Sequence, residues 1–149
     1  MCDINQTTDL KTVNVYKVCY KNEDNKYYAC FSNIKLFVGS VSISTSHYRE
    51  RLKVMYAPSF PVYNENMIDK TTGFKNLKHA RYLQKRFKKI IHDDEEMVIL
   101  KIKLGGEIMQ GTGKNIVTSS ILESAITYAG TEILEIEEVE DKYIRINHR

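Results

Sequence analysis

Hydrophobic and polar residues alternate along much of the chain, a pattern that predicts β-strands. Val13 to Lys21 and Lys26 to Ser32 are rich in Val, Tyr and Phe, which suit a pleated surface. Asn22-Glu23-Asp24-Asn25 lies between them, and Asn and Asp tolerate the backbone conformations of tight turns. Together the three segments predict a β-hairpin.

The most regular alternation runs from Met97 to Leu104. Aliphatic residues share the face that we expect to be buried, and two lysines share the outer face: Val98, Leu100, Ile102 and Leu104, with Lys101 and Lys103 opposite. Gly105-Gly106 then allows a bend or bulge, after which Glu107 to Gln110 continues the strand. A second alternating segment, Tyr48 to Tyr56, predicts a strand whose basic face contains Arg49, Arg51 and Lys53.

Other segments carry weaker patterns. The first ten residues are polar and predict a loose segment, and Ala57 to Gly73 contains both prolines and predicts an ordered loop. Ser120 and Glu123 have the spacing of a capping box, which predicts a short helix through Ala129 with Gly130 as its stop. Further short strands are predicted at Ile34 to Val38, Val41 to Ser44, Ile116 to Thr118, Thr131 to Val139 and Tyr143 to Ile146, with turns at Gly39-Ser40 and Gly111 to Asn115.

The segment from Asn76 to Ile91 has helical periodicity instead. At about 100° per residue, apolar side chains fall on one arc and basic residues, with one tyrosine, fall on the opposite arc. The apolar arc contains Leu77, Ala80, Leu83, Phe87, Ile90 and Ile91, and the basic arc contains Lys78, Arg81, Tyr82, Lys85, Arg86, Lys88 and Lys89. The chain has no acidic residue between Asp69 and Asp93 that could pair with these cations. This basic face is expected to attract an anion.

These elements predict an α+β fold in a single domain, residues 1–149. Strands outnumber helices, tight turns join several of them, and no repeating strand-helix unit requires a parallel sheet. We therefore expect an antiparallel β-sheet with one long amphipathic helix packed on a face and a second, short helix. A chain of 149 residues, 42% of them hydrophobic, is large enough to bury a core without disulfides or metal.

The cysteines and the termini point to a cytoplasmic location. Cys2, Cys19 and Cys30 are odd in number and lack a Cys-x-x-Cys spacing, which favours reduced thiols over a disulfide framework or a zinc site. No apolar run is long enough to span a bilayer, and the first residues lack the pattern of a signal peptide. Neither a cofactor nor a membrane partner is expected.

The net charge of +3 is modest, but its distribution is uneven. Acidic residues gather in Asp93-Asp94-Glu95-Glu96 and in the segment from Glu132 to Asp141, away from the basic helix. This predicts two oppositely charged poles. They could steer an anionic ligand, or bring the acidic strand of one subunit to the basic helix of another.

Candidate catalytic motifs fail on spacing. Gly111-Thr112-Gly113-Lys114-Asn115 suggests a phosphate loop, but a Walker A motif needs Gly at Ile108 and Ser or Thr at Asn115. A hairpin turn is the better interpretation, although backbone amides beside Lys114 and Asn115 could still hold a phosphate. The four histidines have neither zinc-ligand spacing nor the His-x-Thr or His-x-Ser pairs of two-histidine phosphoesterases.

Ser44-Thr45-Ser46 with Glu135 and Glu137 is similar to the Ser-Thr-Ser strand and Glu-x-Glu turn of ADP-ribosyltransferases. That family places an Arg on an earlier strand, and this chain has no Arg before Ser44. The simpler interpretation of Glu135 and Glu137 is the outer face of an amphipathic strand.

The order of several apolar and glycine positions resembles that of small phage and prophage proteins, including the Thoeris anti-defence sponges. The resemblance covers about half the chain, in Gly73-Phe74 with Leu77, Ala80, Arg81 and Phe87, in Val98 to Leu104, and in Lys114-Asn115-Ile116-Val117. It implies a homo-oligomer, in the host cytoplasm, that sequesters cyclic ADP-ribose-type or cyclic oligonucleotide signals without cleaving them. No ligand contacts are transferred from that family.

The leading hypothesis is a non-catalytic protein that binds a phosphorylated small molecule, most simply a nucleotide. Arg and Lys would neutralise phosphates, Tyr82 or another tyrosine would stack on a base, and Asn115 could bond to a base or ribose. The candidate ligand-binding residues are Arg49, Arg51, Lys53, Lys78, Arg81, Tyr82, Lys85, Lys114 and Asn115. A nucleic-acid-binding module, an ADP-ribosyltransferase-like enzyme and a purely structural partner-binding protein remain open alternatives.

Overall fold

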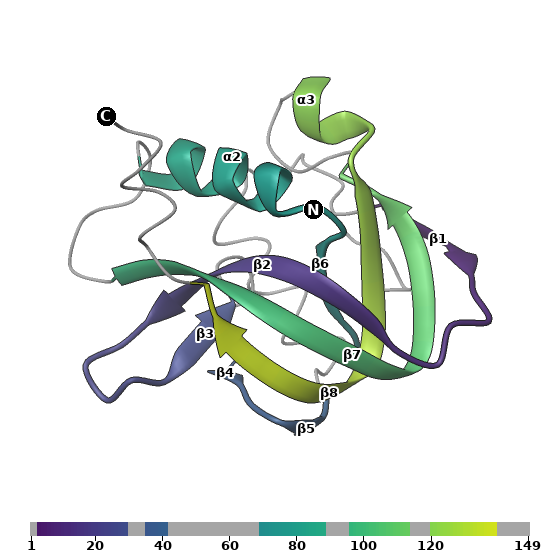
Figure 1. Cartoon of the computed structure of the whole chain (residues 1–149), viewed down its shortest axis with the longest axis horizontal. Coiled ribbons are helices and arrows are strands. Elements are labelled where there is room, and N and C mark those ends of the chain that lie inside the picture. The colour runs from purple at the N-terminus through teal and green to yellow at the C-terminus, as the bar shows by residue number, and fades with distance from the viewer. Residues whose placement is uncertain (1–2, 30–34, 42–68, 89–95, 114–119, 140–149) are drawn as a thin grey trace, which may run out of the picture.

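The computed structural model describes residues 3–29, 35–41, 69–88, 96–113 and 120–139. Most of these residues lie in antiparallel strands, and two helices lie on the same side of the sheet (Figure 1). The strands are β1 (Asp3–Thr7), β2 (Val13–Lys21), β3 (Tyr27–Ala29), β4 (Lys35–Leu36), β5 (Gly39–Ser40), β6 (Thr71–Phe74), β7 (Glu96–Thr112) and β8 (Ile126–Glu138). The helices are α2 (Leu77–Lys88) and α3 (Ser120–Glu123).

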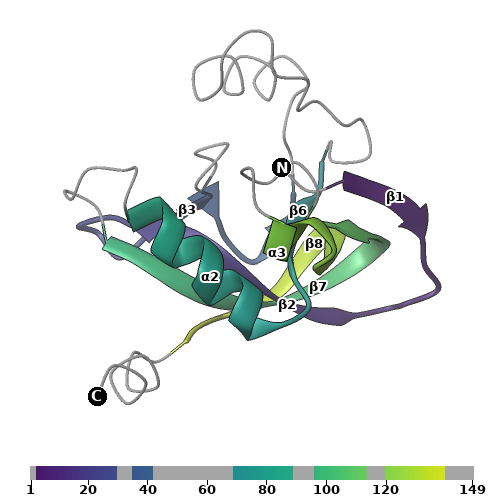
Figure 2. The same cartoon turned by 90° about the horizontal axis from the view of Figure 1, so that it is seen from above.

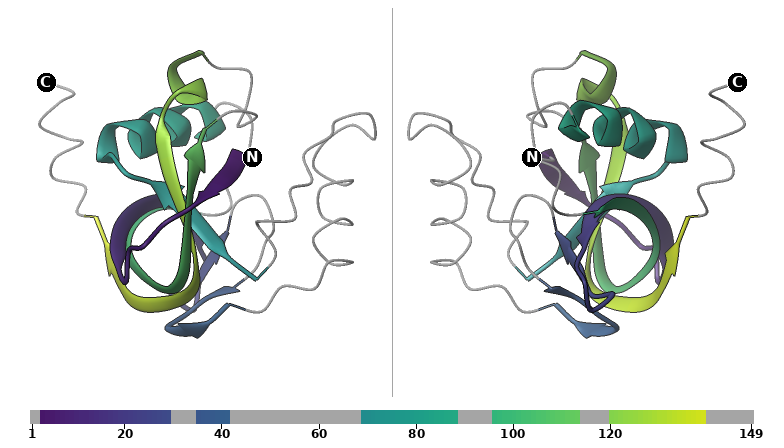
Figure 3. Two further views of the ribbon diagram at one scale, coloured as in Figure 1. Left: turned by 90° about the vertical axis from the view of Figure 1, so that its right-hand side faces the viewer. Right: turned by 90° about the vertical axis from the view of Figure 1, so that its left-hand side faces the viewer.

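Four of the strands close into a ring, which is visible as a curl in Figure 3. β2 pairs with β7, β7 with β8, β8 with β6, and β6 with β2 through Tyr16 and Phe74. The sheet order is β1-β7-β8-β6-β2-β3-β4, and β5 pairs with β8. All of these pairings are antiparallel.

Strand β7 supplies most of the pairing because it is 17 residues long and bends in its middle. Its first half, from Glu96 to Leu104, pairs with β2, and its register with β8 shifts between Gly105 and Ile108. Gly106 has φ of 71°, a left-handed conformation that favours glycine. Thr131 Oγ1 accepts a hydrogen bond of 2.9 Å from the Glu107 amide beside the bend. The predicted bulge at Gly105-Gly106 is confirmed.

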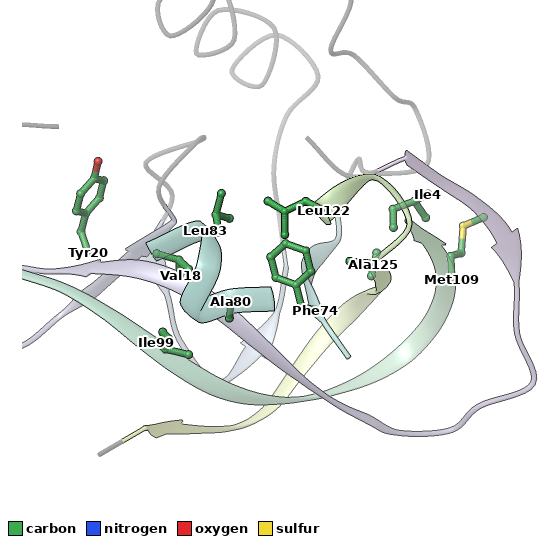
Figure 4. Close-up of a cluster of buried hydrophobic side chains, with 11 residues drawn as sticks. Ile4, Val18, Tyr20, Phe74, Ala80, Leu83, Ile99, Met109, Leu122 and Ala125 are labelled. Carbon is green, nitrogen blue, oxygen red and sulfur yellow. The ribbon is translucent and has the colours of Figure 1, made fainter. Parts of the chain in front are cut away.

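The two faces of β2 and β7 bury different clusters of side chains. One cluster, enclosed by the curled strands, includes Val15, Cys19, Leu100, Ile102 and Leu104. The other lies beneath the two helices and is shown in Figure 4; it includes Val18, Phe74, Ala80, Leu83, Ile99 and Leu122. The predicted alternation of Met97 to Leu104 is confirmed, with the addition that Ile99 is buried on the helix side.

Helix α2 lies along β2 and β7, as Figure 2 shows from above. Ala80, Leu83 and Gln84 are buried against the sheet, and Gln84 Nε2 donates a hydrogen bond of 3.1 Å to the Met97 carbonyl. The helix begins directly after Asn76, whose carbonyl accepts a bond from the His79 amide. It covers 12 residues, so the long helix predicted to Ile91 is not shown, and Lys89 to Ile91 lie outside the described residues.

Several sequence-based predictions were wrong. The first ten residues contain β1, which pairs with the end of β7 and buries Ile4 completely. Thr71 to Gly73, the end of the expected loop, form the buried strand β6 together with Phe74, and Gly39-Ser40, expected as a turn, pair with β8. The predicted helix through Ala129 ends at Glu123, because β8 starts at Ile126 and pairs with β6 and β7 through Ala129 and Gly130.

Other predictions were correct or lie outside the described residues. The hairpin of β2 and β3 is confirmed, although β3 is shorter than predicted. The strand expected from Thr131 to Val139 is the second half of β8. The predicted strands Tyr48 to Tyr56, Ile116 to Thr118 and Tyr143 to Ile146 lie outside the described residues.

Gly73 gives a test of the contact between β6 and β2. A Cβ atom at this position would lie 2.6 Å from Val15 Cγ2 and 3.0 Å from the Tyr16 carbonyl oxygen. Gly73→Ala should therefore reduce the free energy of unfolding by about 1–3 kcal/mol, measured by urea denaturation. In a Val15→Ala background the cost should fall only in part, because Val15 Cβ, 2.8 Å from the added Cβ, and the Tyr16 carbonyl oxygen remain. An unchanged free energy of unfolding in Gly73→Ala would contradict this packing.

Candidate anion-binding surface

Four of the nine predicted binding residues lie within the described residues, and all four are on α2. They are Lys78, Arg81, Tyr82 and Lys85. The other five, Arg49, Arg51, Lys53, Lys114 and Asn115, lie outside the described residues. The structure therefore defines the helical part of the predicted site.

The outward side of α2 follows from the side that it buries. Ala80, Leu83 and Gln84 face the sheet, so residues about half a turn away around the helix face outward. Lys78 and Lys85 are exposed there, and Arg81 and Tyr82 are half-buried on the two flanks. Lys78 and Lys85 are two helical turns apart, a rise of about 10 Å. The cations form a stripe along the helix.

Arg86 belongs to the same surface, although it was not among the predicted binding residues. Its Nη1 donates a hydrogen bond of 3.3 Å to Tyr82 Oη, and its Cζ lies 5.8 Å from the centroid of the Tyr82 ring. Tyr82 also packs against the cluster beneath the helix. The tyrosine that we expected to stack on a base thus has a guanidinium as an intramolecular partner.

His79 lies on the flank of α2 that faces β6. Its ring centroid is 6.0 Å from that of Phe74, and its buried Nδ1 has no hydrogen-bond partner among the described residues. Burial, and secondarily the positive charge of Lys78, lower the pKa of His79 below the ordinary value of 6.5. The ring is therefore neutral at pH 7, and it contributes packing to the surface instead of charge.

No ion pair within the described ranges involves Lys78, Lys85 or Arg86. The sheet differs: Lys101 lies opposite Glu137 and Lys103 opposite Glu135 in the pairing of β7 with β8. Directly opposite residues of an antiparallel pair are close enough for their charges to interact. The register thus places lysines opposite part of the predicted acidic pole, although these described residues form no ion pair with each other, whereas α2 has no acidic residue.

A polar cluster lies at the far end of β8, where Glu138 Oε2 accepts bonds from Lys21 Nζ at 3.1 Å and from Tyr27 Oη at 2.8 Å. Desolvation, and secondarily the Glu138 bond, raise the pKa of Tyr27 above its ordinary value of 10. The bond to Glu138 raises the pKa of Lys21 as well. The cluster joins β2, β3 and β8, which explains it without a functional role.

Glu135 and Glu137 occupy exposed positions on β8, as the amphipathic-strand interpretation predicted. Ser44 to Ser46, the other part of the ADP-ribosyltransferase pattern, lie outside the described residues. The described part of the chain contains no cluster of three or more His, Cys, Asp or Glu residues placed to hold a metal ion. It also contains no helix with the length and apolarity needed to cross a membrane.

Comparisons of this chain with protein-family models, with curated proteins and with solved structures find no match.

His79 offers a test of the electrostatics of this surface. Lys78→Gln removes a nearby positive charge, so the pKa of His79 should rise toward 6.5, measured by NMR titration with His79→Gln to assign the signal. Because the folded-state pKa is lowered, the stability contributed by the neutral ring is present above pH 6.5 and is lost as the pH falls through the folded-state pKa. Lys26→Gln, in the hairpin turn, is the control and should leave the His79 titration unchanged.

Proposed function

We propose that this chain is a non-catalytic binding protein for a phosphorylated small molecule, most simply a nucleotide, which it sequesters on the outward face of α2. The observation that carries the proposal is the charge of that face. It presents Lys78, Arg81, Lys85 and Arg86, and α2 contributes no acidic residue. Like charges three and four residues apart on a helix repel one another, and an external anion would relieve that repulsion.

The side chains on this surface suit phosphate better than other anions. A guanidinium group can donate parallel hydrogen bonds to two oxygens of one phosphate. A lysine ammonium group attracts the phosphate as a point charge and does not require a particular orientation. Two arginines and two lysines within three turns of helix supply both kinds of contact. The resemblance to anti-defence sponges supports a cyclic nucleotide signal as the ligand and a homo-oligomer as the assembly.

A non-catalytic role is proposed because no motif in the sequence has the spacing of a catalytic site and no described side chain acts as an evident nucleophile. Cys19 is buried completely between β-strands, where a ligand on α2 would not reach it. His79 is neutral and packed on Phe74. These side chains stabilise the fold.

The test is isothermal titration calorimetry with cyclic AMP, cyclic di-AMP and cyclic ADP-ribose, with adenosine as the uncharged control. At least one of the three nucleotides should bind and be recovered intact by chromatography, and adenosine should not bind. Lys78→Glu with Lys85→Glu should weaken binding by about tenfold or more, since each 1.4 kcal/mol of lost attraction is a factor of ten.

The matched control is Lys11→Glu with Lys26→Glu, which changes the net charge equally at two exposed lysines outside α2. Its affinity should stay near that of the unmodified protein. Equal weakening by both double variants would mean that total charge, and not this surface, attracts the ligand. A steep loss of binding with salt, together with a preference for oligonucleotides, would instead indicate a nucleic-acid-binding module.

A further inference from the structure

Arg86 differs from the lysines of the α2 surface in being held by a neighbouring side chain. Its guanidinium donates to Tyr82 Oη and lies near the Tyr82 ring, as described above. Lys78 and Lys85 are exposed and make no side-chain hydrogen bond or ion pair within the described ranges. Arg86 is therefore oriented by a neighbouring side chain before any ligand arrives, whereas the two lysines are exposed point charges.

The orientation of Arg86 depends on how Tyr82 is anchored. Tyr82 lies one helical turn before Arg86, and its ring packs against the cluster that contains Val18 and Leu83. This packing restrains the ring that carries the hydroxyl group. Arg86 is half-buried against it, and its Nε is buried without a hydrogen-bond partner. The donors left for a ligand are thus those of the two Nη groups.

We infer that Arg86, positioned by Tyr82, is the group that binds a phosphate of the ligand in a defined geometry, whereas Lys78 and Lys85 supply non-directional attraction. This inference rests on the proposed function and deepens it by naming the recognition element and the ligand class, a phosphate ester. A guanidinium has five N–H donors, and only one of those on Arg86 is used by Tyr82. The remaining Nη hydrogens can be donated to two oxygens of one phosphate. An ammonium group cannot form this planar pair of parallel hydrogen bonds.

The experiment measures the affinity of four variants, Arg86→Lys, Tyr82→Phe, Arg86→Gln and the double variant Arg86→Gln with Tyr82→Phe, for the nucleotides named above: cyclic AMP, cyclic di-AMP and cyclic ADP-ribose. Arg86→Lys keeps the positive charge but loses the planar guanidinium group and its paired donors, and should weaken binding by about tenfold. Tyr82→Phe keeps the ring but loses the hydroxyl acceptor, and should weaken binding by about threefold to tenfold. In an Arg86→Gln background, Tyr82→Phe should have no further effect, because its role is to position Arg86.

Two controls separate this role from a structural one. The urea midpoint of Tyr82→Phe and Arg86→Lys should stay close to that of the unmodified protein, because the first keeps the ring that packs against the cluster and the second keeps the positive charge. Lys85→Gln should reduce the salt dependence of binding, whereas Arg86→Lys should leave it unchanged, since its charge remains.

The outcomes distinguish this inference from the proposed function. If Arg86→Lys binds as tightly as the unmodified protein, or if Tyr82→Phe weakens binding equally when Arg86 is Gln, the inference is wrong. The proposed function would then survive through the Lys78 and Lys85 dependence. If none of the three nucleotides binds the unmodified protein, both are wrong.

Discussion

The bend of β7 at Gly105-Gly106 is the constraint on which the rest of this structure depends. A straight strand of 17 residues would extend well beyond its neighbours, but the bend lets one strand pair with β2 in its first half and with β8 over most of its length. Pairing on both edges closes the ring with β6 and creates two buried faces. The face that points away from the ring, with Val18 and Ile99, is the surface on which α2 packs. The position of the basic helix is therefore a consequence of a glycine bulge.

Closing the ring also decides which charges find partners. Lys101 and Lys103 point outward from β7, and the register brings Glu137 and Glu135 directly opposite them on β8. Charges on paired strands can thus offset one another. Helix α2 has no paired strand opposite its outward side, and within the described residues Lys78 and Lys85 form no ion pair. The register of the sheet thus places acidic and basic residues opposite one another, whereas α2 itself contains no acidic residue.

Patterns that depend on local neighbours were predictable from the sequence. The alternation of Met97 to Leu104, the Asn-rich turn after Lys21 and the helix start after Asn76 are set within a few residues, and all three are confirmed. Strand β1 was missed because its residues after Ile4 are polar and exposed, and its partner is the distant end of β7. Strand β6 was missed because Thr71 and Thr72 become buried only through pairing with a distant part of the chain. The same pairing overrides the helical signals of Ala129 and Gly130. Arg86 was on the predicted basic arc, but only the structure shows that Tyr82 accepts its hydrogen bond.

The repulsion among the positive side chains of α2 is small, and its size decides whether stability or binding is the useful measurement. Lys78 and Lys85 are about 10 Å apart, near the Debye length of physiological salt, so they hardly repel each other. The closer pairs, Lys78 with Arg81 and Arg81 with Lys85, each cost only about 0.2–0.5 kcal/mol. A fold held by hydrophobic burial tolerates such a cost easily, and relieving it would change the melting temperature little. The charge pattern therefore has little effect on folding, so a measurement of stability cannot test the proposed anion site and a measurement of binding affinity can.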